Sequence, residues 1–330
     1  MTFFITGATG HLGYHLVRRL IAQKHTVYAL VLPHDPLIAS LPPEVIIVEG
    51  NILDESSMDR WLNHPHDGYR VLIHAASRVT TQMRKDTLTY RVNVEGTQHI
   101  LNQAHLHHFD HVIYVSSVHA LKELPVGEAI DETHIASPRE VKGFYAKTKA
   151  EATQMVWRDH LMRDFPVSIV FPAGFIGPND LGKGYTTLMI KEAMQQRMNI
   201  WFKGGYDFVD VRDVADAIIT IAETKRIGQA YVLNHAFLPF NTLMKMIDEA
   251  NGHHPIRVYI PRWLIWFAIP FLKIYYWISG KKPLLTYYAF QTMQTNAIFD
   301  HSKATIDFGF QPRPFMETIQ DTVDDLKKQS

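Results

Sequence analysis

The chain has 330 residues, and its 33 basic and 33 acidic side chains give a formal net charge of zero. Nothing in this balance indicates a nucleic-acid-binding surface, so no nucleic-acid partner is expected. The sequence has no cysteine, which excludes disulfides, thiolate metal sites and cysteine nucleophiles. The first apolar run starts at residue 2 and leaves no room for a cleavable signal, so a cytoplasmic location is expected.

The chain begins with a pattern of strand, glycine turn and helix. Residues 2–5 are apolar and β-prone, and Gly7, Gly10 and Gly13 precede an amphipathic stretch. Gly7 can take a tight turn, Gly10 lets the backbone approach a pyrophosphate, and Gly13 lets the helix pack closely on the strand. Unpaired N–H groups and the macrodipole at the helix N-terminus stabilise an anion. This context predicts a dinucleotide site.

Later apolar runs alternate with longer helical stretches. Strands are predicted at residues 26–30, 45–48, 71–73, 112–115 and 167–171, and helices at 56–62, 94–105 and 145–163. Alternation of this kind favours a parallel sheet with crossover helices. The sequence therefore predicts a doubly wound α/β fold.

Tyr145 and Lys149 are four residues apart on the last of these predicted helices. Side chains at this spacing share one helix face. An ammonium held beside a phenol favours the phenolate, so Tyr145 could exchange a proton near neutral pH. The alternative is a solvated lysine one turn away from a half-buried aromatic residue.

Further motifs follow in a fixed order. They are His-Ala-Ala at 74–76, Asn-Val-Glu-Gly-Thr at 93–97, Val-Ser-Ser at 115–117, Pro-Ala-Gly-Phe-Ile-Gly-Pro at 172–178 and Phe-Val-Asp-Val-Arg-Asp-Val-Ala at 208–215. Together with the glycine turn and the Tyr145 pair, they resemble the extended short-chain dehydrogenase/reductase superfamily, the NAD-dependent epimerase/dehydratase family. Gly143 and residues 205–207 make the chain most similar to bacterial dihydroflavonol-4-reductase-like proteins.

The resemblance implies a Rossmann-type doubly wound parallel sheet with a smaller C-terminal substrate-binding lobe. Residues 1–171 would form the NAD(P)-binding domain, with 206–235 and about 300–330 packing back on it. Residues 174–204 and 239–295 would form the substrate lobe.

The resemblance also implies roles for single residues. Ser117 would hydrogen-bond the substrate oxygen, with Ser116 as the alternative, and Tyr145 would exchange the proton. Lys149 would lower the pKa of the tyrosine and bind the nicotinamide ribose, and Asn93 would support a proton relay or the local backbone. Without the other motifs, a serine at a strand end and an asparagine before a helix are ordinary turn and cap residues. Cofactor contacts are expected from Gly7, Thr9, Gly10, His11, Leu12, Gly13, Asn51, Ile52, Ala75, Ala76, Ser116, Tyr145, Lys149, Pro172, Gly174 and Phe175.

One departure from the family pattern concerns the choice of cofactor. Asn51 stands where an acid commonly meets the adenine, although its amide oxygen can still accept that hydrogen bond. After the second strand neither an acid nor an arginine occupies the usual place, since Asp35 lies past the strand. The missing arginine clamp favours NAD over NADP, unless Arg18 or Arg19 supplies it.

A second departure concerns the substrate. Related sugar-nucleotide epimerases place an arginine where this chain has Tyr206, and a polar residue where it has Phe171. Both changes favour an aldehyde or ketone over a nucleotide-diphospho-sugar. We therefore expect an NAD(P)-dependent carbonyl reductase or alcohol dehydrogenase for a hydrophobic small molecule. The alternatives are an epimerase or dehydratase with tightly bound NAD, and a non-catalytic dinucleotide sensor, for which Ser117, Tyr145 and Lys149 would serve no chemical purpose.

Two segments have other possible roles. His105, His107, His108 and His111 cluster near a helix end, but no carboxylate or cysteine completes a ligand pattern, so no metal is expected. Residues 263–278 are apolar and aromatic but are interrupted by Pro270 and Lys273, which disfavours a membrane span. Three interpretations remain open for this segment: a helix lining an apolar pocket, a homodimer contact, or weak contact with a membrane interface.

Overall fold

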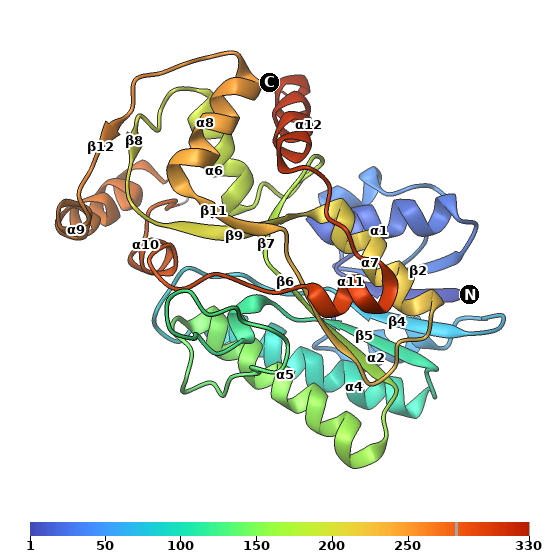
Figure 1. Cartoon of the computed structure of the whole chain (residues 1–330). Helices are drawn as coiled ribbons and strands as arrows, with labels where there is room; N and C mark the ends of the chain where they lie inside the picture. Colours follow the sequence, from blue (N-terminus) through green and yellow to red (C-terminus); the bar gives the residue numbers. More distant parts are fainter. Residues whose placement is uncertain (281–282, 330) are drawn as a thin grey trace.

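The structure is a computed structural model that describes residues 1–280 and 283–329. Within these residues, seven parallel strands form a central sheet in the order β10-β6-β5-β4-β1-β2-β3 (Figure 1). They are β1 Thr2–Thr6, β2 Thr26–Val31, β3 Ile46–Glu49, β4 Arg70–His74, β5 His111–Val115, β6 Val167–Pro172 and β10 Ala230–Leu233. The predicted doubly wound α/β fold is confirmed, and each predicted strand is present with ends displaced by one residue at most.

Helices cover both faces of this sheet (Figure 1). On one face α1 (His11–Ala22) packs against α7 (Val211–Glu223). The other face is covered by α2 (Glu55–Leu62), α4 (Gly96–Leu106) and α5 (Phe144–Arg163). Every residue of β1, β4, β5, β6 and β10 is therefore buried, as two-sided coverage of a parallel sheet requires.

The order of the strands reverses between β1 and β4. From β1 the chain continues outward to β2 and β3, whereas β4 leads in the opposite direction to β5, β6 and β10. The crossovers leaving β1 and β4 therefore diverge, and they open a crevice at the carboxyl ends of these two strands. In doubly wound sheets ligands bind at such a switch point.

A smaller lobe has a hydrophobic core of its own. Its strands are β7 Gly174–Ile176, β9 Gly205–Asp210 and β11 Ala236–Pro239, which form one sheet, and the pair β8 Ile200–Trp201 and β12 Val258–Tyr259. Its helices include α6 Tyr185–Met194, α8 Phe240–Asn251, α9 Arg262–Ser279 and α10 Tyr287–Thr292. The aromatic segment 263–278 forms α9, which continues through Pro270.

The end of the chain does not pack as expected. The short helix α11 (Ser302–Phe308) lies against β10 of the central sheet, in agreement with the prediction for residues 300–330. In contrast, α12 (Phe315–Lys328) packs on α6 and α8, and Ile319 and Val323 are fully buried in the second core. The expectation that all of residues 300–330 pack on the cofactor domain is therefore corrected. The apolar face of α12 is buried in the core of the substrate lobe.

Candidate active site

The glycine turn between β1 and α1 lies at the switch point. Gly7 has a φ of +75°, and a Cβ atom there would come within 2.8 Å of the backbone nitrogen of Ala76, after β4. A Cβ at Gly13 would overlap the carbonyl oxygen of Gly7, so the start of α1 packs against the turn itself. Only Gly7 O approaches a Cβ built at Gly10, at 3.2 Å, which leaves its other side open.

The start of α1 fits an anionic ligand. Its N-cap, Gly10, has no side chain, and no side-chain hydrogen bond caps the helix. The first N–H groups of a helix have no intrahelical partner, and together with the macrodipole they attract a phosphate. The turn and the open side of Gly10 therefore suit the pyrophosphate of a dinucleotide.

The region after β2 holds a carboxylate close to this turn. The hydroxyl of Thr9 donates to Asp35 Oδ2 at 2.7 Å, and Asp35 Oδ1 accepts from the N–H of Leu37 at 2.9 Å. The sequence placed Asp35 beyond the usual position for an acid, whereas the turn after β2 brings it back to the glycine turn. Asn51 makes a local hydrogen bond, because its Oδ1 accepts from the N–H of Leu53 at 2.9 Å.

The other expected cofactor residues line the same edge. Leu12 and Ile52 are buried, and Ala75 and Ala76 follow β4. His11 Nε2 lies 3.1 Å from the carbonyl oxygen of Pro178, and the ring of Phe175 on β7 meets His11 edge-on. Pro172 ends β6, and Gly174 leaves room for the ring of Phe208.

Ser117, Tyr145 and Lys149 meet where β5 ends and α5 begins. Ser117 and Tyr145 are each 8% exposed, and Lys149 is 2% exposed. The hydroxyls of Ser117 and Ser77 lie close enough to the phenol of Tyr145 to lower its pKa through hydrogen bonding. Lys149 Nζ donates to the carbonyl oxygen of Val115 at 2.8 Å. The three residues that the sequence predicted for the site are therefore close together, and the buried Lys149 is hydrogen-bonded to the adjacent strand β5.

The electrostatics differ from the expectation that Lys149 lowers the pKa of Tyr145. Burial raises the pKa of Tyr145 to about 12, and the hydrogen bonds from Ser117 and Ser77 offset only part of this effect. Burial also lowers the pKa of Lys149 to about 7. The ammonium points to Val115 O and lies 5.0 Å from the centre of the Tyr114 ring. Tyr145 is thus protonated at neutral pH.

The two serines face different neighbours. Ser116 Oγ is 2.6 Å from Thr153 Oγ1, on the buried side of α5. Ser117 caps the short 3-10 turn Val118–Ala120 and lies next to Tyr145. Of the two serines, Ser117 is therefore the one that lies beside Tyr145.

Asn93 lies in a π-helical turn, Arg91–Glu95, between α3 (Thr87–Tyr90) and α4. Its Oδ1 accepts from Ser77 Oγ at 3.1 Å and from the N–H of Arg78 at 2.8 Å, and its Nδ2 donates to Thr148 Oγ1. Single π turns inside helices often occur at functional sites. Asn93 therefore positions Ser77, which lowers the pKa of Tyr145, and it also fixes α5 next to Lys149.

His119 completes this side of the site, and sequence reasoning missed it. Its Nε2 is 3.0 Å from the hydroxyl of Tyr206, and its Nδ1 is 3.3 Å from the hydroxyl of Tyr288. Its ring meets Tyr145 edge-on, with ring centres 5.8 Å apart. Burial lowers the pKa of His119 to about 4, so the imidazole is neutral. The sequence signal that could have indicated His119 is its position two residues after Ser117.

Tyr288 reaches the site because Gly143 has no side chain. Gly143 has a φ of +89°, and a Cβ atom there would overlap the ring of Tyr288. Tyr288 belongs to α10, far along the chain from the Tyr145 helix. Nothing in the sequence pattern indicated this contact.

A cavity of about 430 Å³ lies against His119 and Tyr206 on the lobe side. Most of its lining is apolar or aromatic: Val79, Met189, Met198, Ile200, Phe202, Phe208, Phe240, Leu272, Tyr276, Leu284, Leu285, Tyr288 and Met293 take part. Arg197 also lines it and pairs with Glu192 at 3.4 Å. Leu272 and Tyr276 come from α9, so this helix does line an apolar pocket, as one interpretation of the segment proposed.

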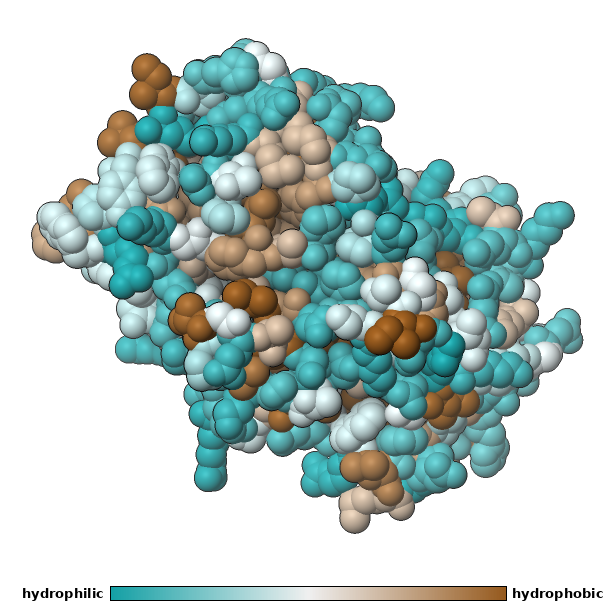
Figure 2. Space-filling view, viewed as in Figure 1, coloured by the Kyte–Doolittle hydropathy of each residue, from teal (hydrophilic) through white to brown (hydrophobic). Residues whose placement is uncertain are grey.

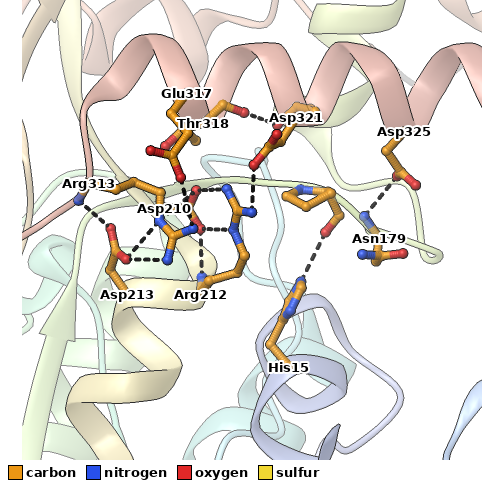
Figure 3. A network of polar contacts seen from close by, with 12 residues as sticks. His15, Asn179, Asp210, Arg212, Asp213, Arg313, Glu317, Thr318, Asp321 and Asp325 are labelled. Atoms are coloured by element: carbon orange, nitrogen blue, oxygen red, sulfur yellow. Dashed lines mark hydrogen bonds and ion pairs between the residues drawn. The ribbon is translucent and has the colours of Figure 1, made fainter. Parts of the chain in front are cut away.

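The motif at 208–215 forms an ionic network that joins the lobe to the central sheet (Figure 3). Arg212 Nε and Nη2 donate to the two carboxylate oxygens of Asp210, at 3.0 and 2.7 Å, and Nη1 reaches Asp321 of α12 at 2.6 Å. Arg313 Nε donates to Asp213 Oδ1 at 2.8 Å. Although burial would raise the pKa of Asp210, the hydrogen bonds and charges of Arg212 and Arg313 bring it below its usual value.

A second contact joins helix α1 to the lobe (Figure 3). His15, one helical turn after His11, also points to the carbonyl oxygen of Pro178, with Nε2 at 3.0 Å. The next residue, Asn179, donates its backbone N–H to Asp325 of α12 at 2.8 Å. The loop 177–179 therefore ties α1 to α12.

The clustered histidines have separate partners. His105 Nε2 is 2.8 Å from Asp159 Oδ2, His107 Nε2 is 3.2 Å from Asp59 Oδ1, and His111 Nε2 is 2.8 Å from Ser168 Oγ. In the ranges 1–280 and 283–329, no group of three or more His, Cys, Asp or Glu side chains could hold a metal ion.

A dinucleotide turn beside a tyrosine, a lysine and a serine, at the switch point of a doubly wound sheet, is the arrangement of an NAD(P)-dependent oxidoreductase. A profile of the NAD dependent epimerase/dehydratase family matches residues 3–234, more than half of the chain. The chain belongs to this family, and the resemblance of its motifs is confirmed.

Similar proteins extend over nearly the whole chain. Sterol demethylase protein B of Methylococcus capsulatus is 28% identical over 327 residues, covering 98% of this chain and 97% of that protein. A Synechocystis protein provisionally named as a dihydroflavonol 4-reductase is 26% identical, covering 97% and 93%. The mouse sterol-4-alpha-carboxylate 3-dehydrogenase is 23% identical, covering 97% and 89%. The crystal structure of gox2253 matches with a TM-score of 0.84 at 27% identity, covering 100% and 98%.

Proposed function

We propose that this protein is an NAD(P)-dependent alcohol dehydrogenase or carbonyl reductase for an apolar, ring-containing substrate of the sterol kind. The observation that carries the proposal is the apolar cavity whose wall, His119 and Tyr206, adjoins Tyr145. Two of the similar proteins are named for sterols, which supports the same substrate class.

The polar residues at the inner end of the cavity would orient one oxygen of the substrate. Ser117 would donate a hydrogen bond to that oxygen, and Tyr145 would exchange its proton with it. The bound dinucleotide supplies hydride transfer to or from the carbon. Because the pKa of Tyr145 is about 12, the phenol carries its proton at neutral pH and is suited to act as the acid in carbonyl reduction.

Lys149 would supply the positive charge that favours the reverse reaction, the oxidation of an alcohol. Oxidation of an alcohol requires Tyr145 to accept a proton as the phenolate, and a nearby cation stabilises that form. With its pKa near 7, Lys149 carries this charge at and below neutral pH. We expect it to hold the nicotinamide ribose as well, because the resemblance implies that contact.

The cavity argues against a nucleotide-sugar substrate. Tyr206 replaces the arginine that would clamp a pyrophosphate, and its hydroxyl is bonded to His119. The cation in the lining, Arg197, is paired with Glu192. A diphosphate in this cavity would lose its hydration without gaining a charged partner of its own.

The proposal is tested by titrating cofactor-stripped protein with NADH and with NADPH, followed by a panel of carbonyl compounds. We expect binding of one nicotinamide cofactor and reduction of apolar ring ketones in preference to short, charged ones. Tyr145→Phe should abolish turnover and leave cofactor affinity nearly unchanged. Retained NAD in the purified protein, with turnover of a nucleotide-sugar and no added cofactor, would instead establish an epimerase or dehydratase.

A further inference from the structure

The outer face of α9 is apolar along its whole length. Its exposed apolar positions from Trp263 to Trp277 recur every three or four residues, and Ile278 follows directly, so they line one side of the helix. They are Trp263 at 69% exposure, Phe267 at 66%, Phe271 at 61%, Ile274 at 56%, Trp277 at 83% and Ile278 at 74%. Isolated exposed apolar residues are ordinary, whereas a continuous stripe of this size marks a binding surface.

The neighbouring segment extends this face. Ile256 is 90% exposed, and Val258 and Tyr259 of β12 are exposed as well. In Figure 2 apolar residues gather at the left edge of the molecule, where Figure 1 places α9 and β12. We call this surface, formed by β12, residue 256 and the outer side of α9, the α9 face.

The stretch of sequence that contains the α9 face carries charges of one sign. Between Glu249 and Asp300 the sequence contains no aspartate or glutamate, but it contains five basic residues: Arg257, Arg262, Lys273, Lys281 and Lys282. Arg257 pairs with Asp248, from outside this stretch. Arg262 donates to the neutral amide of Gln294, and Lys273 is exposed. Lys281 and Lys282 lie outside the described residues.

We propose that the α9 face docks on the surface of an anionic lipid bilayer, with α9 lying in the headgroup region. An amphipathic helix with tryptophans toward its ends and a lysine at its border has the composition of an interfacial helix. Each basic residue near an anionic surface is attracted to it. No helix among residues 1–280 and 283–329 is long and apolar enough to cross a membrane. The α9 face is thus suited to lie on a bilayer.

A second copy of the chain is the main competing occupant, and charge disfavours it. A symmetric dimer pairs the same patch with itself. Lys273 and Arg262 would then face their own copies, and residues 250–299 contain no acid that could neutralise them. An anionic membrane, in contrast, provides the missing negative charge.

The test measures co-sedimentation of the full chain with vesicles, in the absence of substrate and cofactor. We expect binding to phosphatidylcholine vesicles that contain phosphatidylserine, weaker binding to phosphatidylcholine alone, and weakening by added salt. Lys273→Gln should reduce the affinity about fivefold, the effect of one charge at such a surface. No binding to either vesicle would overturn the proposal.

Variants locate the docking surface. The double variant Phe267→Ser/Phe271→Ser should reduce vesicle affinity roughly tenfold or more, because both rings leave water on docking. The matched control, Leu106→Ser/Leu161→Ser, removes two side chains that are each 68% exposed elsewhere on the surface, and it should bind like the unmodified chain. Trp277→Gln provides a second variant if the first does not fold. Equal loss in the control would overturn the assignment.

The molar mass measured by light scattering in the absence of lipid shows whether the α9 face binds a second copy of the chain. We expect a mass that does not depend on the residues of the α9 face. A dimer that the Phe267→Ser/Phe271→Ser variant converts to a monomer would show that the face binds a second copy, and the membrane proposal would be wrong.

One consequence rests on the proposed function. The inner side of α9 lines the cavity through Leu272 and Tyr276, so docking would bring the cavity next to lipid that dissolves an apolar substrate. Phe267→Ser/Phe271→Ser should then raise KM for a substrate supplied in vesicles and leave KM for a water-soluble ketone unchanged. If vesicle binding is lost but both KM values stay the same, the substrate route is wrong while docking stands.

Discussion

The hydroxyl of Thr9 donates a 2.7 Å hydrogen bond to the carboxylate of Asp35, which is 26 residues away in the chain. The bond places a negative charge beside the glycine turn, on the side where β2 ends. A carboxylate at this place can accept hydrogen bonds from ribose hydroxyls, whereas it repels a ribose phosphate.

We therefore expect NADH to bind more tightly than NADPH. Asp35→Asn should reduce the ratio of NADH affinity to NADPH affinity by about tenfold, or ~1.4 kcal/mol, because it removes the repulsion between the carboxylate and the ribose phosphate of NADPH. Fluorescence titration with both cofactors measures the change, with the exposed Glu44→Gln as control. Tighter NADPH binding by the unmodified protein would show that another group, such as Arg18 or Arg19, reads the phosphate.

Lys149→Met should separate stability from activity. The folded protein holds Lys149 with a pKa of about 7, against 10.5 for the ordinary group, so burial of the charge costs stability at neutral pH. Methionine has a similar length without the charge, and we expect the unfolding free energy to rise by roughly 1–4 kcal/mol. Turnover should fall at least about a hundredfold. Unchanged turnover would remove Lys149 from the mechanism.

The lowered pKa of Lys149 also predicts how the free energy of unfolding changes as the pH rises. Between about pH 7 and 10.5 the unfolded chain binds a proton at Lys149 that the folded chain does not, so stability increases with pH in this window. Urea unfolding at several pH values should show this slope in the unmodified protein. It should be smaller in Lys149→Met, and an identical slope would show that other groups cause it.

Acid should destabilise the protein through its buried histidines. Burial lowers the pKa of His15, His111 and His119 from 6.5 to about 4, and that of His74 to about 3. Between these values the unfolded chain binds more protons, so each histidine removes up to ~1.4 kcal/mol per pH unit as the pH falls. Asp207, with its pKa raised to about 7, acts in the opposite direction.

Urea unfolding at about pH 7 and about pH 5 measures the net effect. The four histidines should outweigh Asp207. His111→Asn removes one titrating ring far from the cavity, and it should reduce the loss between the two pH values. An equal loss in this variant would show that His111 titrates normally in the folded protein.

His119→Phe should affect substrate binding more than the chemical step. The variant keeps a ring beside Tyr145 but leaves the hydroxyls of Tyr206 and Tyr288 without their shared partner. We expect a rise in KM of about tenfold and a loss of ~1–3 kcal/mol in unfolding free energy. A larger fall in kcat with unchanged KM would instead place His119 in proton transfer.

The ionic network of Figure 3 should depend on Asp210 more than on Asp321. Asp210 is 1% exposed and meets two arginines, whereas Asp321 is 40% exposed. Asp210→Asn leaves two cations without their central partner and should cost about 3 kcal/mol. Asp321→Asn should cost less than ~1 kcal/mol, because solvent screens its pair. Thermal and urea unfolding compare the two, and equal effects would contradict this ranking.

The sequence predicted those parts of the fold that depend on local pattern. The runs of apolar residues placed the strands, and the spacing of Gly7, Gly10 and Gly13 placed the dinucleotide turn, since backbone geometry there allows few other residues. Tyr145 and Lys149 lie one turn apart on the same helix, so their placement also followed from spacing.

Features that depend on long-range packing were not predictable in this way. Tyr288 reaches His119 across the lobe, and Asp35 returns to Thr9 through a turn, so no local pattern shows either contact. The direction of the pKa shift of Tyr145 was also missed, because burial outweighs the hydrogen bonding of Ser117 and Ser77. The amphipathic pattern of α12 predicts a buried face but does not indicate which core covers it.

The path of the chain between its two cores limits how the molecule can move. The backbone enters the lobe at β7, returns through β9 to α7, leaves again at β11, comes back to α11 and ends in the lobe with α12. A hinge motion would have to bend all of these connections at once, and the arginine network would resist it. We therefore expect the two cores to melt in a single cooperative transition, and substrates to exchange through side-chain movements at the cavity mouth rather than through an opening lobe.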